Sequence, residues 1–281
     1  MLLKGKEVAE KNRLFCIDLI EKYNLNPHLY VFLIGNDAGS RYYVESIKKQ
    51  SSKFKINVTI DHFNEDDITE DLLIEKINDL NENKDIHGIM VQKPLPKNIN
   101  TSKIEQTISP KKDVDGFHAL NAGLMLYEKE CFLPCTAEAI LEIMDFYDIS
   151  AEGKHVVVVG RSNVVGKPIA NLLLYKKKGR NATVTICHSR TPDLSLFTKQ
   201  ADILITAVGV AQIIKADMIK NDVIIIDAGI NELDIDGKIG YVGDVDFDSC
   251  SQKAAAITPV PGGVGSVTTS ILFKHVVNHY K

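Results

Sequence analysis

Residues 156–168 decide the fold of the second half of the chain, and they read Val156-Val157-Val158-Val159-Gly160-Arg161-Ser162-Asn163-Val164-Val165-Gly166-Lys167-Pro168. The four valines predict a buried strand, the glycines predict a turn, and the apolar residues after Pro168 predict a helix. A strand that turns through glycines into a helix gathers backbone N–H groups at the positive end of the helix dipole, which accepts a pyrophosphate. The spacing is Gly-x5-Gly instead of G-x-G-x-x-G, so a purely structural strand–turn–helix is the alternative interpretation.

The end of the next predicted strand, residues 183–187, indicates which dinucleotide would bind. A site for NAD normally has an acidic residue there, which binds the 2′-hydroxyl of the ribose. Residues 188–191 contain no carboxylate that would repel a 2′-phosphate, whereas the hydroxyl of Ser189 and the guanidinium of Arg190 can bind one. Arg161 is a second candidate cation, although exposed loop arginines are often only solvated. The sequence therefore favours NADP over NAD.

Strand and helix patterns alternate along the chain, which predicts parallel sheets with helices on both faces. In the second half we expect strands at residues 155–159, 183–187, 202–207 and 223–228, and a last helix at about 267–280. In the first half we expect strands at residues 30–34, 56–60 and 88–92, and helices at about 40–54 and 68–80. The fold class is α/β, with two α/β domains around a cleft, of which the second is a Rossmann-like dinucleotide-binding domain.

Length and composition indicate an ordinary globular protein of two domains. The chain has 281 residues, 44% of them hydrophobic and 25% charged, and its formal net charge is −4. Neither a large basic patch nor a long apolar run is visible, so we expect neither nucleic acid nor a membrane as a partner. The five cysteines are scattered and no signal peptide is visible, so we predict a cytoplasmic protein without a metal site.

Three further stretches have no obvious packing role, namely residues 91–96, 112–118 and 257–265. Rigid loops rich in proline and glycine, next to isolated polar residues, suit a preformed cleft for a small molecule. Together with residues 159–162 and 187–189, these stretches closely resemble the methylenetetrahydrofolate dehydrogenase/cyclohydrolase family. The resemblance covers essentially the whole chain, from Gly5-Lys6 to the last helix.

The resemblance implies a bifunctional enzyme of one-carbon metabolism. Such an enzyme oxidises 5,10-methylenetetrahydrofolate with NADP to 5,10-methenyltetrahydrofolate, and then hydrolyses this product to 10-formyltetrahydrofolate. It also implies a folate-binding catalytic domain over residues 1–135 plus 266–281, and an NADP-binding domain over residues 136–265. Members of the family are usually homodimers, so a second copy of the chain is the expected partner, besides the folate substrates.

The resemblance assigns roles to individual residues. Asp115 matches the carboxylate that holds the pterin ring, and a carboxylate can accept paired hydrogen bonds from an aminopyrimidine edge; Asp113 is a nearby alternative. Gln92 matches a glutamine that contacts the reacting region of folate, and Tyr43 matches a tyrosine that packs against the substrate. The other residues expected to bind folate are Ser40, Pro261, Gly262 and Gly263. The residues expected to bind the cofactor are Gly160, Arg161, Ser162, Val165, Gly166, Ser189, Arg190 and Ile230.

One position departs from the family pattern in a way that bears on catalysis. The family has Tyr-x-x-x-Lys on the second helix, where the lysine serves proton transfer in the hydrolysis. Counting from Tyr43, this chain has Ile47 at the lysine position, and Lys48 lies a further ~100° around the helix. Lys48 is the candidate replacement, and Lys93 is a second one. Two smaller departures are Ser266, where a proline is usual, and the loop at residues 37–39.

The two reactions depend differently on that lysine. Oxidation of the methylene bridge removes a hydride and no proton, so correct positioning of the substrate supplies much of the acceleration. Hydrolysis requires proton transfer, and a positioned acid or base typically contributes about 10²–10⁴-fold. Our hypothesis is an intact dehydrogenase with a weak or absent cyclohydrolase. The alternatives are a bifunctional enzyme that uses Lys48, a non-catalytic NADPH or folate sensor, and a generic two-domain dehydrogenase of the shikimate type.

Overall fold

The computed structural model describes residues 1–235 and 238–279, which form two compact units. Unit 1 comprises residues 1–9 and 136–268, and unit 2 comprises residues 10–135 and 269–281. Two helices contribute residues to both units, α1 (Gly5–Tyr23) and α10 (Val264–Asn278). No helix in the described part of the chain is long and apolar enough to cross a membrane.

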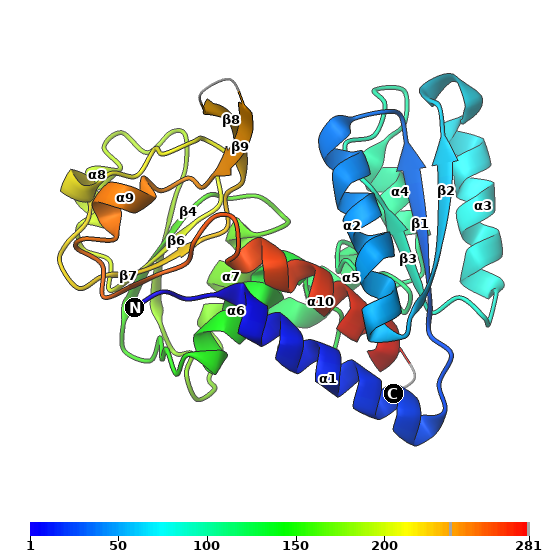
Figure 1. The fold of residues 1–281 in the computed structure, drawn as a ribbon, viewed down its shortest axis with the longest axis horizontal. Helices are drawn as coiled ribbons and strands as arrows, with labels where there is room; N and C mark the ends of the chain where they lie inside the picture. Colours follow the sequence, from blue (N-terminus) through cyan, green and yellow to red (C-terminus); the bar gives the residue numbers. More distant parts are fainter. Residues whose placement is uncertain (236–237, 280–281) are drawn as a thin grey trace. The chain divides into compact units, whose positions relative to one another are not determined.

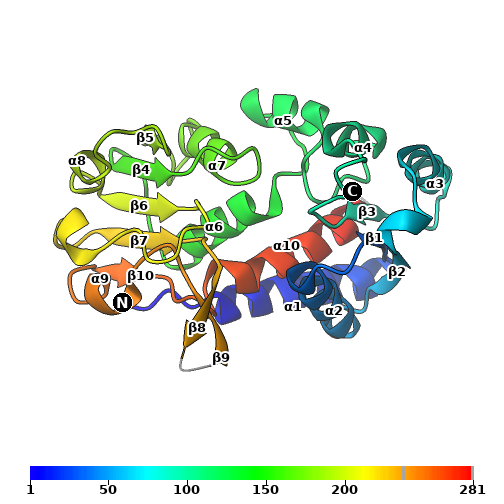
Figure 2. The ribbon, with the colours of Figure 1, turned by 90° about the horizontal axis from the view of Figure 1, so that it is seen from above.

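Unit 1 is built on a parallel five-stranded sheet with the strand order β10-β7-β6-β4-β5, which Figure 2 shows as a stack. The strands are β4 (His155–Val159), β5 (Thr183–Cys187), β6 (Ile203–Thr206), β7 (Ile224–Asp227) and β10 (Ala256–Ile257). The connecting helices are α6 (Cys135–Phe146), α7 (Gly166–Leu173), α8 (Ser195–Thr198), η2 (Ala216–Met218) and α9 (Phe247–Cys250). Chain order reverses direction between β4 and β6, which is where open α/β sheets bind ligands.

Unit 2 is built on a parallel three-stranded sheet with the strand order β2-β1-β3. The strands are β1 (His28–Ile34), β2 (Asn57–Phe63) and β3 (Gly88–Val91). Figure 1 shows α2 (Ala38–Phe54) and α3 (Glu70–Glu82) on opposite faces of this sheet. The remaining helices are η1 (Glu65–Asp67), α4 (Thr101–Thr107) and α5 (Ala119–Leu126). The switch of strand order lies between β1 and β3, so the loops that follow these two strands form the expected ligand-binding edge.

Local sequence explains where α2 begins and ends. The Asp37 carboxylate accepts a hydrogen bond from the backbone N–H of Ser40 at 2.8 Å, which satisfies one of the free donors of the first turn. At the other end Lys55 adopts a left-handed conformation with φ of 56° and closes the helix. The buried face of the helix recurs at helical spacing and consists of Ser40, Val44, Ile47, Ser51 and Phe54.

The structure confirms the predicted α/β class with parallel sheets, and each predicted strand and helix is present with shifts of one to a few residues. Several elements lie outside the predicted set. They include the helices α4 and α5, the short edge strand β10, and the antiparallel hairpin of β8 (Asn231–Ile235) and β9 (Lys238–Val242), together with the short helices η1, α8, η2 and α9. The predicted domain bounds of 1–135 plus 266–281 and 136–265 stay a prediction.

Candidate functional site

Gln92 and Ser40 meet where β3 ends in unit 2. Gln92 follows the last residue of β3, and its amide donates a hydrogen bond to the carbonyl oxygen of Lys93 at 2.7 Å. The same amide nitrogen lies 3.5 Å from the hydroxyl of Ser40, in the first turn of α2. That hydroxyl lies 2.8 Å from the Asp37 carboxylate and 3.2 Å from the Lys93 carbonyl oxygen. The two predicted folate-binding residues are therefore held together by the start of α2 and the loop after β3.

The two aspartates of the segment beside β3 have different surroundings. Asp113 is 2% exposed and accepts hydrogen bonds from the backbone N–H groups of Phe117 and His118 and from the Asn121 amide, at 3.1, 2.8 and 2.9 Å. The Asp113 carboxylate therefore stabilises the turn in which Asp115 lies. Asp115 is half-buried and lines a small pocket in unit 2. Of the two sequence candidates, Asp115 has the carboxylate available to a ligand.

Both Asp115 and Tyr43 have raised pKa values, and Asp115 contributes to the shift of Tyr43. The pKa of Asp115 is raised to about 6 by burial and by nearby Asp113, and this value already includes the opposing effects of Lys93, His275 and a hydrogen bond from Cys135. Burial also raises the pKa of Tyr43 far above its usual value, and the charge of Asp115 adds to this effect. Tyr43 is hydrogen-bonded to Thr269. At neutral pH the site therefore combines an ionised carboxylate with a tyrosine that keeps its proton.

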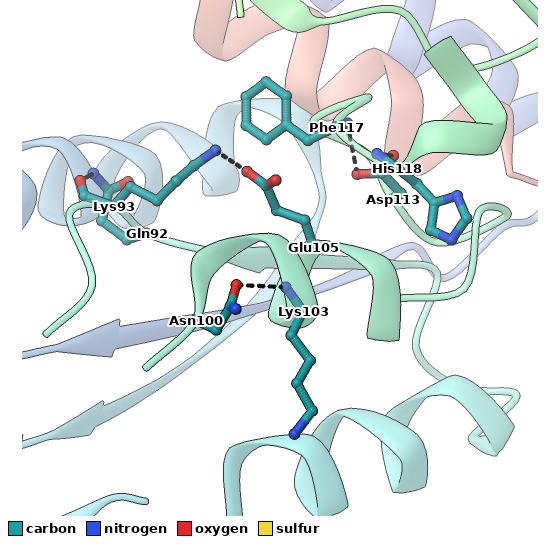
Figure 3. Close-up of polar contacts among 8 residues, drawn as sticks. All are labelled: Gln92, Lys93, Asn100, Lys103, Glu105, Asp113, Phe117 and His118. Carbon is teal, nitrogen blue, oxygen red and sulfur yellow. Dashed lines mark hydrogen bonds and ion pairs between the residues drawn. The ribbon is translucent and has the colours of Figure 1, made fainter. Parts of the chain in front are cut away.

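Lys93 is fixed in the same pocket by two contacts (Figure 3). Its ammonium lies 2.7 Å from Oε1 of Glu105, on α4, and 3.6 Å from the centroid of the Phe117 ring. The two charged side chains are 29% and 26% exposed, so this pair is better shielded from solvent than a typical surface pair. A carboxylate and the face of an aromatic ring both stabilise a cation. Lys93 is therefore held as a positive charge next to Asp115.

The structure separates the two residues of α2 that compete for the lysine role. Ile47 belongs to the buried face of the helix and is 0% exposed. Lys48 is exposed and is absent from that buried face, on which Val44, Ile47 and Ser51 lie. Among the predicted catalytic residues, Tyr43, Gln92 and Asp115 thus lie in or beside the pocket region of unit 2, and Lys48 points to solvent.

In unit 1, residues 160–166 connect β4 to α7 in the way that the sequence predicts. A side chain at Gly160, where φ is 130°, would clash with the carbonyl oxygen of Ala207, and one at Gly166 would clash with the carbonyl oxygen of Gly160. The Ser162 hydroxyl accepts the N–H of Val165 at 3.1 Å and lies 3.4 Å from the N–H of Gly166. The turn thus brings the backbone close to the N-terminus of α7, which is the geometry that accepts a pyrophosphate.

The loop after β5 lies beside this turn. β4 pairs with β5, and the N–H of Gly160 donates to the carbonyl oxygen of Cys187 at 2.9 Å, so both loops start at the same edge of the sheet. Ser189 and Arg190 are exposed on one loop, and Arg161 is exposed on the other. Their hydroxyl and guanidinium groups fit a dinucleotide with a 2′-phosphate. Ile230 is 64% exposed and follows β7 on the same sheet edge.

Two buried aspartates that the sequence analysis did not single out hold the neighbouring loops of unit 1. Asp244 is 0% exposed and accepts the backbone N–H groups of Val208, Gly209 and Val210 at 2.6, 3.3 and 3.1 Å. Asp227 is 3% exposed and accepts the N–H groups of Gly229 and Val245, both at 2.9 Å. Burial raises the pKa of Asp227 to about 6. An acidic residue at the end of an apolar strand, as in residues 223–228, was the available signal for Asp227.

Pro261, Gly262 and Gly263 also lie in unit 1, on the loop between β10 and α10. The carbonyl oxygen of Gly262 accepts the backbone N–H of Gly5 at 2.9 Å, which ties this loop to the N-terminal segment. A separate pocket of unit 1 is lined by residues 257–260 and by Asp227 and Phe247, among others. The roles of Pro261, Gly262 and Gly263 in folate binding stay a prediction, as do the roles of the other candidate site residues.

Two family models cover most of the chain. The catalytic domain of tetrahydrofolate dehydrogenase/cyclohydrolase matches residues 3–115, and the NAD(P)-binding domain of the same family matches residues 134–281. The bifunctional protein FolD of Bacillus licheniformis is 48% identical over 283 residues, which cover 100% of this chain and 97% of the relative.

Solved structures agree with these matches. The bifunctional FolD methylenetetrahydrofolate dehydrogenase/cyclohydrolase of Campylobacter jejuni has a TM-score of 0.93 at 41% identity, with 99% of this chain and 98% of that chain covered. The Trypanosoma brucei enzyme, complexed with NADP and an inhibitor, has a TM-score of 0.93 at 32% identity and covers 100% and 97%. The matches confirm the expected fold and the expected folate dehydrogenase, and they agree with NADP as its cofactor. The chain belongs to the tetrahydrofolate dehydrogenase/cyclohydrolase family.

Proposed function

We propose that the chain oxidises 5,10-methylenetetrahydrofolate with NADP to 5,10-methenyltetrahydrofolate, and that its cyclohydrolase step is weak or absent. The observation that carries this proposal is the position of Ile47. It occupies the place of the family's lysine, and it is completely buried, whereas Lys48 is exposed. The proposed folate-binding residues Tyr43, Gln92 and Asp115 of unit 2, and the glycine turn of unit 1, support an intact dehydrogenase.

Asp115, Gln92 and Tyr43 are the proposed folate-binding groups of unit 2, with Ser40 supporting Gln92. The carboxylate of Asp115 accepts paired hydrogen bonds from the aminopyrimidine edge of the pterin, and this requires the ionised form. Gln92 offers an amide near the reacting carbons, and Tyr43 offers a half-buried ring that keeps its phenolic proton. Pro261, Gly262 and Gly263 are proposed to complete the folate site.

The cofactor is proposed to bind at the carboxyl edge of the sheet of unit 1. The turn at Gly160, Arg161 and Ser162, with Val165 and Gly166 at the start of α7, is proposed to hold the pyrophosphate. Ser189 and Arg190 are proposed to hold the 2′-phosphate, and Ile230 to contact the remainder of the dinucleotide. When bound, NADP supplies the hydride acceptor.

The oxidation demands little acid–base chemistry from the protein. The methylene carbon loses a hydride, and the lone pairs of the two flanking folate nitrogens stabilise the amidinium cation that forms. No proton leaves in this step, so the side chains of unit 2 need only position the substrate. An ionised Asp115 and a protonated Tyr43 are compatible with such a role.

Hydrolysis of the methenyl product is different because water must attack and protons must move when the ring opens. Ile47 can neither donate nor accept a proton. Lys48 lies on the exposed face of α2, and Lys93 is held by Glu105 and Phe117. The second candidate function is the complete bifunctional activity, which is favoured by the bifunctional names of the relatives from Bacillus licheniformis and Campylobacter jejuni.

The arrangement of the whole protein is part of the proposal. We propose a folate-binding catalytic domain of residues 1–135 plus 266–281, and an NADP-binding domain of residues 136–265. We also propose a homodimer located in the cytoplasm, as the family resemblance implies. Light scattering coupled to size-exclusion chromatography tests the proposed dimer. The molar mass measured should be about twice the mass of one chain, which is 31.1 kDa.

The test follows the forward reaction with methylenetetrahydrofolate and limiting NADP. The reduced cofactor and the methenyl product are quantified separately by their absorbance. The proposal predicts that one methenyl product accumulates for each NADPH formed, and that it decays only at its rate in buffer. If NADPH forms while the methenyl product decays faster than in buffer, the bifunctional candidate is correct. If both ligands bind without any NADPH forming, the chain is a non-catalytic sensor.

A further inference from the structure

The loop after β3 places a lysine in the folate-binding region that the oxidation itself does not require. Lys93 contributes to the wall of the small pocket that Asp115, Phe117 and Glu105 also line. Its ammonium is held between the Glu105 carboxylate at 2.7 Å and the Phe117 ring at 3.6 Å. Two contacts on this long side chain restrict the position of its ammonium.

The ammonium of Lys93 lowers the pKa of the Asp115 carboxyl group. The charged and titratable groups that influence Asp115 come from several elements. They are Lys93 on the loop after β3, Asp113 on its own segment, Cys135 at the start of α6 and His275 on α10. Asp115 in turn acts on Tyr43 of α2, and Glu105 of α4 lines the same pocket. Burial and Asp113 favour the protonated form of Asp115, and Lys93 is the foremost influence in the opposite direction.

We infer that Lys93 is a positioning residue of the folate site, whose fixed ammonium keeps Asp115 ionised so that it can bind the aminopyrimidine edge. This inference rests on the proposed role of Asp115. A protonated acid would present one donor to an edge that itself consists of N–H donors, so the complex would lose a hydrogen bond and gain a repulsive contact. Lys93 acts through Asp115 and exchanges no proton with the substrate.

The ammonium of Lys93 has two partners in the partly buried pocket. Glu105 balances the ammonium, and the Phe117 ring covers it, so neither partner is left unpaired in a partly buried pocket. Lys103, which lies on α4 like Glu105, pairs with Glu70 at 2.7 Å but is 52% exposed. Figure 3 shows the side chain of Lys103 directed away from Lys93 and Glu105. Lys103 is therefore a matched control for a charge that does not contribute to the pocket.

The experiment measures the dissociation constant of folic acid between pH 5.5 and 9, for the purified full-length chain and its variants. In the unmodified chain binding should weaken below about pH 6, where Asp115 gains a proton. In Lys93→Met the midpoint of this change should move up by about one pH unit. A shift of that size weakens binding about threefold at pH 6.5 and leaves it unchanged at pH 9. Lys93→Arg should restore the original profile, and Lys103→Met should not alter it.

Further variants separate the possible outcomes. Lys93→Met/Glu105→Gln leaves no unpaired carboxylate and should fold even if Lys93→Met does not, with a smaller upward shift because the negative charge of Glu105 is removed as well. An unchanged pH profile in Lys93→Met and in Lys93→Met/Glu105→Gln overturns the inference, while loss of folate binding in Asp115→Asn still supports the proposed function. If Asp115→Asn binds folic acid normally at every pH, the proposed role of Asp115 is itself wrong. A loss of kcat at all pH values with unchanged binding would assign Lys93 to the chemical step and overturn the inference.

Discussion

Replacement of Asp244 by alanine should weaken both the fold of unit 1 and its affinity for NADP. The Asp244 carboxylate accepts three successive backbone N–H groups at residues 208–210, and it also accepts the amide of Asn231 at 3.0 Å. A buried donor that loses its acceptor costs about 1–3 kcal/mol. Gly209 and Val210 are exposed, so water can replace the acceptor for their N–H groups, while Val208 and Asn231 are half-buried. The expected loss is therefore about 2–4 kcal/mol in the free energy of unfolding.

Urea denaturation measures this loss, and initial rates at varied NADP measure the accompanying change in KM. Because the 208–210 loop follows β6 at the edge where the cofactor is proposed to bind, KM for NADP should rise about tenfold, equivalent to ~1.4 kcal/mol. Asp246→Ala is the control. The Asp246 carboxylate accepts a hydrogen bond from the Ser249 hydroxyl at 2.7 Å, and its removal should cost less than about 1 kcal/mol in the free energy of unfolding. An Asp244 variant as stable as the Asp246 variant, with unchanged KM, would refute the reasoning.

Three further predictions concern the lysine position, the cofactor and the folate-binding acid. Ile47→Lys should raise the rate of hydrolysis by about 10²-fold or more. It should also lower the free energy of unfolding by about 2 kcal/mol, because a fully buried apolar side chain is lost. Ile47→Met is the control and should leave the rate of hydrolysis unchanged. Arg190→Ala should raise KM for NADP about tenfold and have little effect on KM for NAD, because an exposed ion pair to a phosphate contributes ~1–2 kcal/mol. Equal changes in KM for both cofactors would contradict the proposed contact of Arg190 with the 2′-phosphate. The pKa of Asp115 is about 6 in the folded chain, above its value in the unfolded chain, so the folded chain retains a proton that the unfolded chain loses, and the free energy of unfolding falls as pH rises through about 4 to 6. Asp115→Asn should remove this fall, which urea denaturation at pH 5 and at pH 8 measures. A difference in stability between the two pH values that is the same in Asp115→Asn would contradict the prediction.

The parallel sheets could be predicted from the sequence because their strands are buried on both faces. The valines of β4 and the run at β1 are nearly continuous apolar stretches bounded by glycine, and such patterns have few alternative structures. The hairpin of β8 and β9 was missed because its pattern is polar and its pairing is local. The edge strand β10 has two residues and is defined only by its pairing with β7, which no local pattern could reveal.

The sequence could predict those residues of the site that lie in short motifs. Gln92 and Asp115 lie in short motifs, and their place at the end of β3 and in the adjoining segment follows from the strand order. Asp113 and Asp115 differ because the backbone of the turn donates hydrogen bonds to the Asp113 carboxylate. Lys93 is fixed by Glu105, which lies twelve residues further along the chain, on α4. Contacts of this kind join segments that are separate in the sequence, so they required the structure.

The most direct test of the central claim adds preformed 5,10-methenyltetrahydrofolate to the enzyme without NADP and follows the decay of its absorbance. Because no oxidation is needed, the rate reports on hydrolysis alone. With Ile47 buried and Lys48 on the exposed face of α2, we predict a decay indistinguishable from that in buffer at every enzyme concentration. A decay rate that increases in proportion to enzyme concentration would contradict the claim and establish a working cyclohydrolase without the family's lysine.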